Sequence, residues 1–503
     1  NRVQVFSGNG TFITKWGGYG NINGTLRSPS GVATDQRGNV YVADTANNRV
    51  QVFSGNGTFI TKWGNFGSYF LNGSFSWPAA IAVNPSNGNV YVADTANNRV
   101  SAFILSSSTI NVAFSSKDGQ IYGNDTSIKI QPVYAGLKFP TAIAFLGPDD
   151  ILVLQKENNT IMRIVNGRML DEPVLNLGNT VKIKGCMCDI AISHNNNGTS
   201  YAFLYYYLAE VTGEDGTTRL VNSLYRYDII NGKFTNPKLL FEIPSAINGI
   251  HHGGKLMIGP DKNVYLTIGD INGRQTRAQN IRNGSLPDGS SAILRLTQDG
   301  EPVGSGLLGE ASPLNKYYGY GIRNSFGIDY DSVSGNVWIT DNGPDYGDEL
   351  NLVMPGFNGG WRKIVGMSQL ANGFNSSDLE QFEGKGKYYD PQFEWLPSAG
   401  VTDVAFFDSD RLGRQYQNNL FVGDINHGYL YRFLLNETRT GLSLSGSLKD
   451  KIANNDIEVQ QVAFAKFEGG ITDLKIGPDG LLYVVTLGGK ILRLEPIPTN
   501  SVR

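Results

Sequence analysis

Positive charge is sparse in this sequence and is not gathered into runs. Lys and Arg together number 42 of the 503 residues, Asp and Glu number 45, and charged residues make up only 17% of the chain. A nucleic-acid-binding protein needs a basic surface to neutralise phosphates, and no Lys/Arg-rich run supplies one. The composition therefore excludes nucleic acid as a partner.

Long apolar runs are also missing. No stretch of about eighteen apolar residues could span a membrane as a helix, and the first residues lack the charged, apolar and small-residue order of a signal peptide. The sequence begins inside a repeated unit, so we expect a processed product or a fragment.

Asn-x-Ser/Thr triplets, in contrast, occur ten times, and each is a candidate glycosylation point of an exported glycoprotein. We therefore expect an extracellular or cell-surface location. The triplets begin at Asn9, Asn23, Asn56, Asn72, Asn124, Asn158, Asn197, Asn283, Asn375 and Asn436.

Cysteine is limited to two residues, Cys186 and Cys188, in the segment KGCMCDIAI. In a strand, residues two apart project from the same face. Three states are open for the pair: two small buried thiols, a disulfide that closes a small strained loop, and a metal ligand pair, which this spacing alone supports weakly.

Glycine and aromatic residues are abundant where charge is not. The chain has 62 Gly, 24 Tyr and 25 Phe. This composition favours many short strands joined by tight turns over long charged helices. The expected fold class is all-β.

The segment NRVQVFSGNGTFITKWG occurs at Asn1 and again, unchanged, at Asn48. YVADTANNRV, which leads into the second copy, recurs and ends in a third, partial copy that begins at Asn98. A repeat with a period of 47 to 50 residues indicates one supersecondary unit used several times. Alternating apolar and polar residues around SGNG predict an antiparallel meander in each unit. Two and a half units are too few to close a ring.

These units resemble the NHL repeat, through PSGVATD, GNVYVADT and NNRVQVF. The resemblance covers residues 1–104 and implies blades of a six-bladed propeller. We expect an incomplete NHL propeller here. Its exposed sheet edges predict self-association with another copy of the chain, or completion by an upstream segment.

Beyond the repeats, residues 105–135 lose the period and are predicted to be a connector. Residues 136–497 contain six looser units of two apolar strands each, which predict a self-contained six-bladed β-propeller. Residues 498–503 form a tail. The six units begin near Pro140, Cys188, Gly254, Asn324, Thr402 and Thr472.

Only four histidines occur, and two of them stand in NGIHHGGKLMIGPDKNVYLTIGD. A histidine at a strand entrance beside Gly-Gly is suited to remove a proton from a hydroxyl; the alternative is a surface or capping role. This segment resembles the H-x-G-G-R-L-x-x-G-P-D-G motif of the soluble PQQ-dependent glucose/sorbosone (aldose sugar) dehydrogenase family. Two further segments resemble motifs of the same family: YGIRNSFGIDYDSVSGNVWITDNGPDYGDELNLVMPGFNGGW and ITDLKIGPDGLLYVVTLGGKILRLEP.

The resemblance implies that an aldose is oxidised at its anomeric carbon, with hydride transfer to PQQ and with calcium polarising the cofactor. His251 falls on the catalytic base position. Arg323 is a second catalytic candidate and, with Asn324, matches a pair that faces cofactor and substrate; its alternative role is to hold a loop by pairing with a carboxylate. Lys184 is a weaker candidate for cofactor binding.

The calcium candidates lie in DNGPDYGDEL. The resemblance assigns the carbonyl oxygens of Gly343 and Pro344 to calcium, and the nearby carboxylates of Asp348 and Glu349 add oxygen donors of the kind that a hard divalent ion prefers. The alternative is an ordinary turn, because Asp, Gly, Asn and Pro are the residues that turns use.

Three cations of the family pattern are missing. Asn426 stands where the family has a lysine, and Gly470 and Thr472 stand where it has two arginines. PQQ carries three carboxylates, so its pocket needs several cations. Two functions follow: an exported sugar dehydrogenase, or a non-catalytic extracellular binding or assembly protein that uses both propellers as scaffolds and keeps a degenerate cofactor site.

Overall fold

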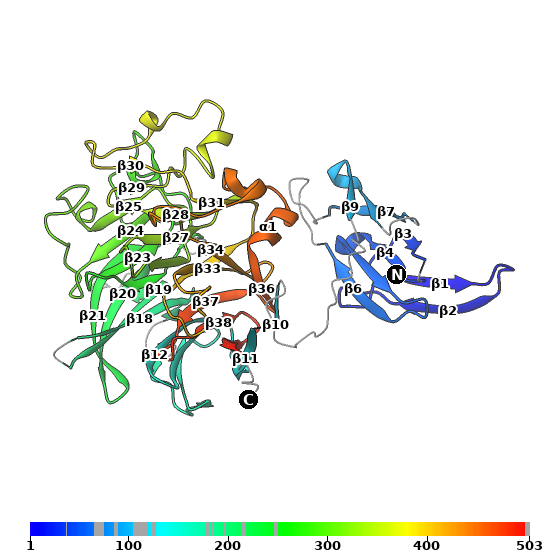
Figure 1. Ribbon diagram of the computed structural model, residues 1–503, viewed down its shortest axis with the longest axis horizontal. Coiled ribbons are helices and arrows are strands. Elements are labelled where there is room, and N and C mark those ends of the chain that lie inside the picture. The colour runs from blue at the N-terminus through cyan, green and yellow to red at the C-terminus, as the bar shows by residue number, and fades with distance from the viewer. Residues whose placement is uncertain are drawn as a thin grey trace. The chain divides into compact units, whose positions relative to one another are not determined.

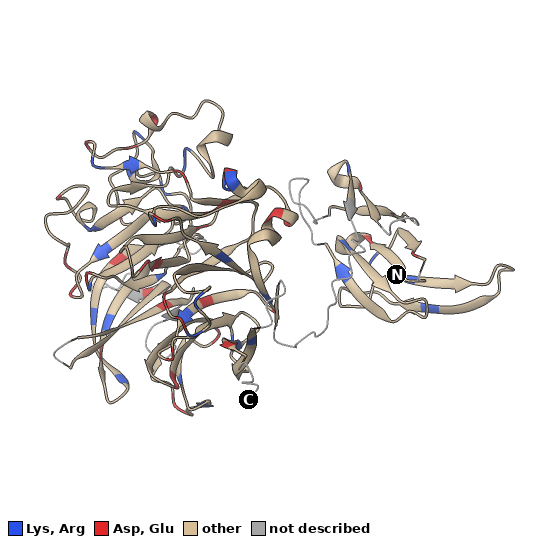
Figure 2. Cartoon of the chain, viewed as in Figure 1, with Lys and Arg blue, Asp and Glu red and all other residues tan. Residues whose placement is uncertain are grey.

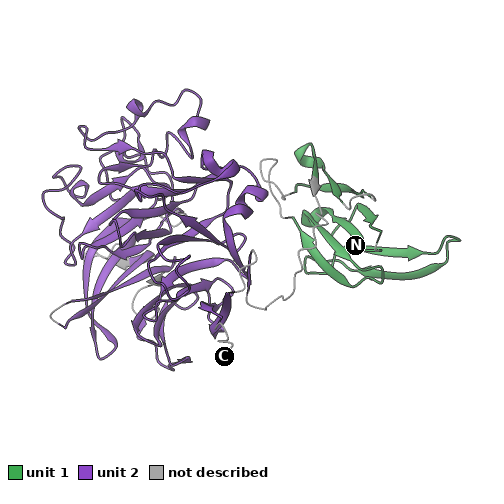
Figure 3. Ribbon diagram, in the orientation of Figure 1, with its two compact units in different colours: residues 1–113 green, residues 114–503 purple. Residues whose placement is uncertain are grey.

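The computed structural model divides into two compact units, residues 1–113 and 114–503 (Figure 3). Each unit is described by itself below. The structure describes residues 1–36, 38–64, 75–84, 89–103, 119–122, 127–177, 182–183, 185–195, 198–212, 218–245 and 250–497.

Within its described residues, the first unit contains antiparallel sheets of two, four and three strands. Their strands are β1 (Arg2–Phe6) and β2 (Phe12–Gly17); β3 (Gly31–Thr34), β4 (Val40–Asp44), β5 (Arg49–Phe53) and β6 (Phe59–Trp63); and β7 (Pro78–Val83), β8 (Val90–Asp94) and β9 (Arg99–Phe103).

The repeated word ADTANNR has a structural role. Asp44, which is fully buried, accepts hydrogen bonds from Arg49 Nε at 2.7 Å and from Asn47 Nδ2 at 2.9 Å. Asn48 adopts a φ of 52°, a left-handed conformation that asparagine tolerates better than most residues. The second copy repeats the link, with Arg99 Nε donating to Asp94 at 2.8 Å. The segment therefore fixes the turns between β4 and β5 and between β8 and β9.

The duplicated segment folds into the same hairpin twice, β1–β2 and β5–β6. Val3 pairs with Trp16 and Val50 pairs with Trp63, and both hairpins carry a bulge at the equivalent valine and phenylalanine. Burial differs, because every residue of β5 is buried whereas β1 is exposed or half-buried. The neighbouring sheets, not the hairpin sequence, decide how much of the apolar surface is covered.

The second unit contains six sheets within its described residues, here named A to F. Sheet A has β12 (Pro140–Gly147), β13 (Asp150–Gln155), β14 (Thr160–Val165), β15 (Arg168–Met169) and β16 (Leu175–Asn176). Sheet B has β17 (Lys182–Ile183), β18 (Met187–His194), β19 (Ser200–Thr212), β20 (Thr218–Ile230) and β21 (Lys233–Pro244). Sheet C has β22 (Leu256–Ile258), β23 (Val264–Ile268), β24 (Ala292–Leu296), β25 (Tyr317–Tyr320), β29 (Phe357–Asn358) and β30 (Lys387–Tyr388).

The remaining sheets complete the unit. Sheet D has β26 (Gly327–Tyr330), β27 (Val337–Asp341), β28 (Tyr346–Val353), β31 (Phe393–Pro397) and β35 (Ile452–Ala453). Sheet E has β32 (Val401–Phe407), β33 (Asn419–Asp424), β34 (Tyr429–Leu434), β36 (Ala463–Phe467) and β10 (Gly119–Ile121). Sheet F has β37 (Ile471–Ile476), β38 (Leu482–Thr486), β39 (Lys490–Pro496) and β11 (Ile128–Ala135).

One strand of each sheet contributes to a closed ring. β12, β18, β22, β26, β32 and β37 contact one another in that order, and β37 contacts β12. Figure 1 labels β12, β18 and β37. Each of the six apolar runs noted in the sequence contains most of one of these strands. Aspartates link successive strands of the ring by accepting backbone N–H groups: Asp189 from Leu256 at 2.8 Å, Asp329 from Phe406 at 2.8 Å, Asp403 from Leu474 at 3.0 Å and Asp473 from Ile143 at 2.7 Å.

The ring is closed by the two ends of the unit. β11 pairs with β39 and β10 pairs with β36, so early strands complete the last two sheets. Residues 119–121 and 128–135 fall within the predicted connector (105–135), whereas the structure places them in this unit. The reason is that these strands pair with partners more than 300 residues away, which local pattern does not reveal.

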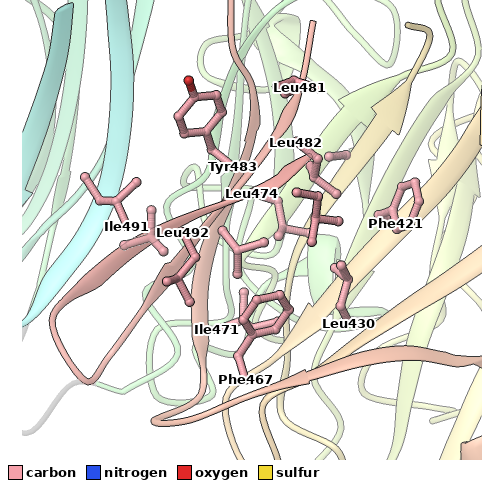
Figure 4. Packing of buried hydrophobic residues seen from close by; sticks show 14 of the residues in the cluster. Phe421, Leu430, Phe467, Ile471, Leu474, Leu481, Leu482, Tyr483, Ile491 and Leu492 are labelled. Atoms are coloured by element: carbon pink, nitrogen blue, oxygen red, sulfur yellow. The ribbon is translucent and has the colours of Figure 1, made fainter. Parts of the chain in front are cut away.

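Buried side chains from three sheets seal this closure. Ile471, Leu474 and Leu492 of sheet F pack with Phe421 of sheet E (Figure 4), and Ile143 of sheet A belongs to the same cluster. The apolar alternation of these strands is therefore what holds sheet F between its two neighbours.

Helices are few in the described part of the chain. α1 (Asp456–Val462) is capped by Asn455, whose side chain accepts the N–H groups of Ile457 and Glu458. Short 3-10 helices span Thr45–Asn47, Thr95–Asn97, Arg277–Gln279, Leu314–Lys316, Ser368–Leu370, Ser376–Asp378 and Gly446–Asp450. Among the described residues, no helix is long and apolar enough to cross a membrane. Charged residues of both signs are distributed over many elements of both units (Figure 2).

Candidate active site

His251 lies in the loop that leads into β22 and has a φ of 60°, an uncommon left-handed conformation for a residue with a side chain. Its Nδ1 is 2.8 Å from Oδ1 of Asp270, and the other oxygen of Asp270 accepts from Trp361 Nε1 at 2.9 Å. A carboxylate at Nδ1 fixes the tautomer in which Nε2 carries the lone pair. His251 is therefore oriented as a base that acts through Nε2.

The neighbouring His252 has a different role. It is buried, its Nδ1 lies 3.0 Å from Nδ2 of Asn222, and its ring stacks on Tyr207 with 4.1 Å between ring centroids. These contacts make His252 part of the packing, so His251 is the histidine of the pair that is available for chemistry.

Arg323 and Asn324 are held beside the His251 loop. Asp341 accepts both of their backbone N–H groups, at 2.8 and 2.6 Å. Asn324 Oδ1 accepts from the N–H of Gly253 at 3.2 Å, and the carbonyl of Arg323 accepts from the N–H of Asp270 at 2.8 Å. The structure thus brings together the two site segments that the sequence indicated, through a network of backbone bonds.

The guanidinium of Arg323 faces backbone oxygen rather than a carboxylate. Its Nη1 donates to the carbonyls of Asn342 at 3.0 Å and Gly343 at 2.6 Å, and the group lies 5.5 Å from the ring centroid of Trp361. The alternative role considered for Arg323, pairing with a nearby carboxylate, is therefore not the contact that its side chain makes.

A cavity of about 420 Å³ opens beside these loops. Every sheet of the ring contributes to its wall, so the cavity lies on the ring axis. Representative lining residues, one from each sheet or the loop before it, are Thr141, Cys188, Lys255, Phe326, Thr402 and Thr472. Asn324, Gly343 and Pro344 also line it. Gly254, which follows His251 by three residues, is part of the same wall.

Lys255 forms the charged centre of this wall. It is buried, and its Nζ forms ion pairs with Asp403 at 2.7 Å, with Asp473, and with Asp189 at 3.6 Å. Burial lowers the pKa of Lys255, but the three carboxylates outweigh burial and hold that pKa well above its usual value. Lys255 is fully engaged by these aspartates and adds little positive charge to the cavity.

The four predicted metal residues do not form one site. Gly343 and Pro344 line the cavity, whereas Asp348 accepts hydrogen bonds from the N–H of Gly343 at 3.0 Å and the N–H of Gly400 at 2.6 Å. Glu349 projects elsewhere, since successive residues of β28 point to opposite faces. No group of three or more His, Cys, Asp and Glu side chains suited to a metal occurs in the described part of the chain.

Glu349 lies opposite Asp341 on the neighbouring strand. It accepts hydrogen bonds from the N–H of Gly366 at 2.7 Å and from Asn351 at 2.8 Å. Burial, reinforced by the nearby Asp341 carboxylate, holds the pKa of Glu349 well above its usual value. Burial also raises the pKa of Asp341, to about 7, against the two backbone hydrogen bonds that it accepts.

Several site features were not predicted from the sequence. Asp270 and Trp361 complete the His251 arrangement, and Lys156 lines the cavity just after β13. Lys156 forms no ion pair among the described residues and could have been found as a cation at the end of a strand. Lys184, the weaker cofactor candidate, lies outside the described residues.

The cavity fits a planar quinone of the PQQ class in size and in polar groups. Its volume lies within the usual range for ligand sites, about 300 to 1,000 Å³. Asn324 and Thr472 offer side-chain hydrogen bonds, and the carbonyls of Gly343 and Pro344 offer calcium ligands, the former shared with Arg323. Of the two described lysines that line the cavity, Lys255 is engaged by aspartates, and Lys156 is the one left to pair with a carboxylate of PQQ.

A closed ring of β-sheets around an axial cavity is the architecture of a β-propeller. Residues 137–493 match the family model described as Glucose / Sorbosone dehydrogenase, and residues 26–53 and 75–103 match NHL repeats. The chain belongs to the glucose/sorbosone dehydrogenase family and carries NHL repeats before that domain.

Individual relatives agree with this family. Aldose sugar dehydrogenase YliI of Escherichia coli is 26% identical over 392 residues, which cover 75% of this chain and 95% of the relative. Quinoprotein glucose dehydrogenase B of Acinetobacter calcoaceticus is 30% identical over 146 residues, 25% of this chain and 29% of the relative. The PQQ-bound aldose sugar dehydrogenase of Streptomyces coelicolor has the same fold, with a TM-score of 0.54 and 24% identity over 74% of this chain and 98% of that structure.

Proposed function

We propose that sheets A to F are the six blades of a sugar dehydrogenase that oxidises an aldose at its anomeric carbon. The observation that carries this proposal is the His251–Asp270 pair, whose free Nε2 lies on the loop that forms the cavity wall. A PQQ-type quinone, when bound, supplies the hydride acceptor. Lys156, Asn324 and Thr472 would hold it, and the carbonyls of Gly343 and Pro344 would hold calcium.

The protein's own contribution is proton transfer and electrostatics. Nε2 of His251 removes the proton of the anomeric hydroxyl, and Asp270 stabilises the resulting imidazolium while keeping the ring in place. Trp361 donates to Asp270 and prevents that carboxylate from turning away. Arg323 provides a fixed positive group beside the cavity, where it favours negative charge that develops during oxidation.

The test combines cofactor binding with a base-deficient variant. PQQ is titrated calorimetrically into the calcium-loaded protein, and activity is measured with a panel of aldoses and an artificial electron acceptor. His251→Gln should lower kcat by about 10²- to 10⁴-fold without loss of PQQ binding. His194→Gln, an exposed histidine that bonds Ser200, is the matched control and should keep full activity. Absence of PQQ binding at high micromolar concentration, or full activity of His251→Gln, would overturn the proposal.

Asp270→Asn tests the positioning role. The amide of Asn can accept from Nδ1 of His251 through its oxygen, but without a negative charge. It can also present its NH₂ group, which favours the wrong tautomer of the ring. We therefore expect kcat to fall by about tenfold or more while KM changes little. The pH dependence of kcat should also shift, because the imidazolium loses its carboxylate partner. A variant with an unchanged kcat and pH profile would make Asp270 merely structural.

We also propose that the first unit associates with another copy of itself. Large apolar side chains are exposed on it, among them Phe6 at 51%, Val32 at 58% and Val100 at 68%. Burial of these side chains by a second copy would stabilise such an association, which favours the assembly function considered above. Light scattering of the purified chain should show association that increases with concentration; a stable monomer at high concentration contradicts this.

Export with glycosylation is the proposed location. Six triplet asparagines have exposed side chains, a requirement for modification: Asn9, Asn23, Asn56, Asn158, Asn283 and Asn375. Mass spectrometry of the natively expressed protein, before and after enzymatic deglycosylation, should reveal glycans at several of these. An unmodified mass would contradict the proposal.

A further inference from the structure

The two cysteines of the chain meet at the cavity. Their Sγ atoms are 3.4 Å apart and are not bonded to each other. In a regular strand, residues two apart are separated by about 6.6 Å along the chain. Here a β-bulge shortens the path: Met187 pairs with Tyr206 and Asp189 pairs with Tyr205, which leaves Cys188 as the extra residue.

Both cysteines line the 420 Å³ cavity, so a small molecule that enters it can reach them. Cys186 is 7% exposed, and Cys188 is half-buried. Lys156 and Tyr207 line the same part of the wall. The pair therefore belongs to the wall of a ligand-sized cavity, with Cys186 buried and Cys188 half-buried.

The two thiols differ in acidity. A hydrogen bond from Cys188 lowers the pKa of Cys186, and the positive charge of Lys156 and a hydrogen bond with Tyr207 add to this effect against burial. Burial and the neighbouring Cys186 raise the pKa of Cys188 well above its usual value. Cys186 is thus the thiol prepared to attack, and Cys188 is the thiol that stays protonated; its Sγ also donates to the carbonyl oxygen of Cys186 at 3.6 Å.

We propose that Cys186 and Cys188 form a redox-active dithiol that exchanges with low-molecular-weight disulfides entering through the cavity. The Cys186 thiolate attacks one sulfur of the small disulfide, which breaks its S–S bond and releases one small thiolate that takes up a proton. Cys188 then loses its proton to solvent and attacks Cys186 Sγ. The second small thiol leaves, so the protein pair loses two electrons and the small disulfide gains them.

The exchange changes the cavity wall. Formation of the bond requires the sulfurs to close from 3.4 Å to about 2.05 Å. Cys188 packs tightly against Gly254: a Cβ atom built on that glycine would lie only 2.9 Å from Cβ of Cys188. Movement of Cys188 therefore reaches the loop that carries His251.

Thiol content measured in defined mixtures of reduced and oxidised glutathione tests this inference, independently of sugar oxidation. The full chain is equilibrated, quenched with acid, alkylated with iodoacetamide and weighed intact. We expect one two-electron transition in which both thiols disappear together. Two free thiols in fully oxidised glutathione, or a mixed disulfide that persists in the unaltered protein, would overturn it.

Single variants assign the roles. Cys188→Ser should trap glutathione on Cys186, whereas Cys186→Ser should react at least about tenfold more slowly at pH 7, because burial, the largest cause of the raised pKa of Cys188, remains in that variant. Addition of Lys156→Met to the Cys188→Ser variant should slow the reaction of its Cys186 with oxidised glutathione. Equal rates for the two serine variants would refute the asymmetry. Circular dichroism checks folding, and if a variant fails to fold, the two-thiol transition of the unaltered chain decides.

Discussion

Replacement of Lys255 by methionine tests what closes the ring of strands. Lys255 forms ion pairs with three buried aspartates, from β18, β32 and β37. Removing one partner of a buried ion pair costs about 3 to 5 kcal/mol, because the remaining charges are left unpaired. The upper part of that range applies here, since three carboxylates lose their shared cation. Each of them also accepts a backbone N–H from the next strand of the ring, so their repulsion acts on the ring itself.

Denaturant unfolding, followed by the fluorescence of the buried Trp338 and Trp395, measures the loss as a lower midpoint at unchanged slope. The penalty should be larger at pH 7 than at pH 5: without Lys255 the pKa values of the aspartates rise in the folded state, so the variant loses stability as pH rises through them. Lys475→Met is the matched control, because Nζ of Lys475 is 3.8 Å from Asp473 and partly exposed, and it should cost less than about 1 kcal/mol. A loss below about 1 kcal/mol for Lys255→Met, or a larger loss at pH 5, would refute the reasoning.

Three further predictions concern other parts of the chain. Phe53→Ala should destabilise the first unit by about 3 to 5 kcal/mol and Phe6→Ala, the same residue of the exposed copy, by less than about 1 kcal/mol, since their exposures are 1% and 51%; equal losses in denaturant unfolding would contradict this. Burial raises the pKa of Asp329 to about 6, against the hydrogen bonds that it accepts and the charge of Lys475. The folded protein therefore resists ionisation of Asp329 and loses stability from pH 4 to pH 7. The stability of Asp329→Asn relative to the unaltered protein should grow over that window by up to about 3 kcal/mol, and a constant difference would contradict the prediction. Lys156→Met should weaken PQQ binding by about tenfold or more in calorimetric titration, and unchanged affinity would mean that this cation does not face the cofactor.

Local pattern predicted the parts of the fold that depend on neighbouring residues. The six apolar runs after residue 136 contain the strands of the ring because alternation along a strand reflects its own two faces. The pattern of IKIQPVYA did not place β11, since its partner β39 lies at the other end of the unit. Pairing across hundreds of residues leaves no local signature.

The candidate site, too, was predicted only where its residues stand in a local sequence motif. His251, Arg323 and Asn324 stand in recognisable words, and the structure brings them together. Asp270 and Trp361 were not found, because they reach His251 through space and no spacing rule connects them. Asp348 and Glu349 were predicted to add oxygen donors to one calcium site, but they are adjacent residues of β28 and point to opposite faces of its sheet.

The two unchanged copies of the N-terminal hairpin have a consequence for how the first unit can vary. The hairpin keeps its register and its bulge both when covered and when exposed, so its backbone geometry does not depend on the sheet beside it. Insertion or loss of one whole period would present the adjoining sheets with the same surface as before. The length of this array can therefore change by recombination between identical segments without any compensating substitution, so that the number of repeats becomes a heritable variable separate from the chemistry of the second unit.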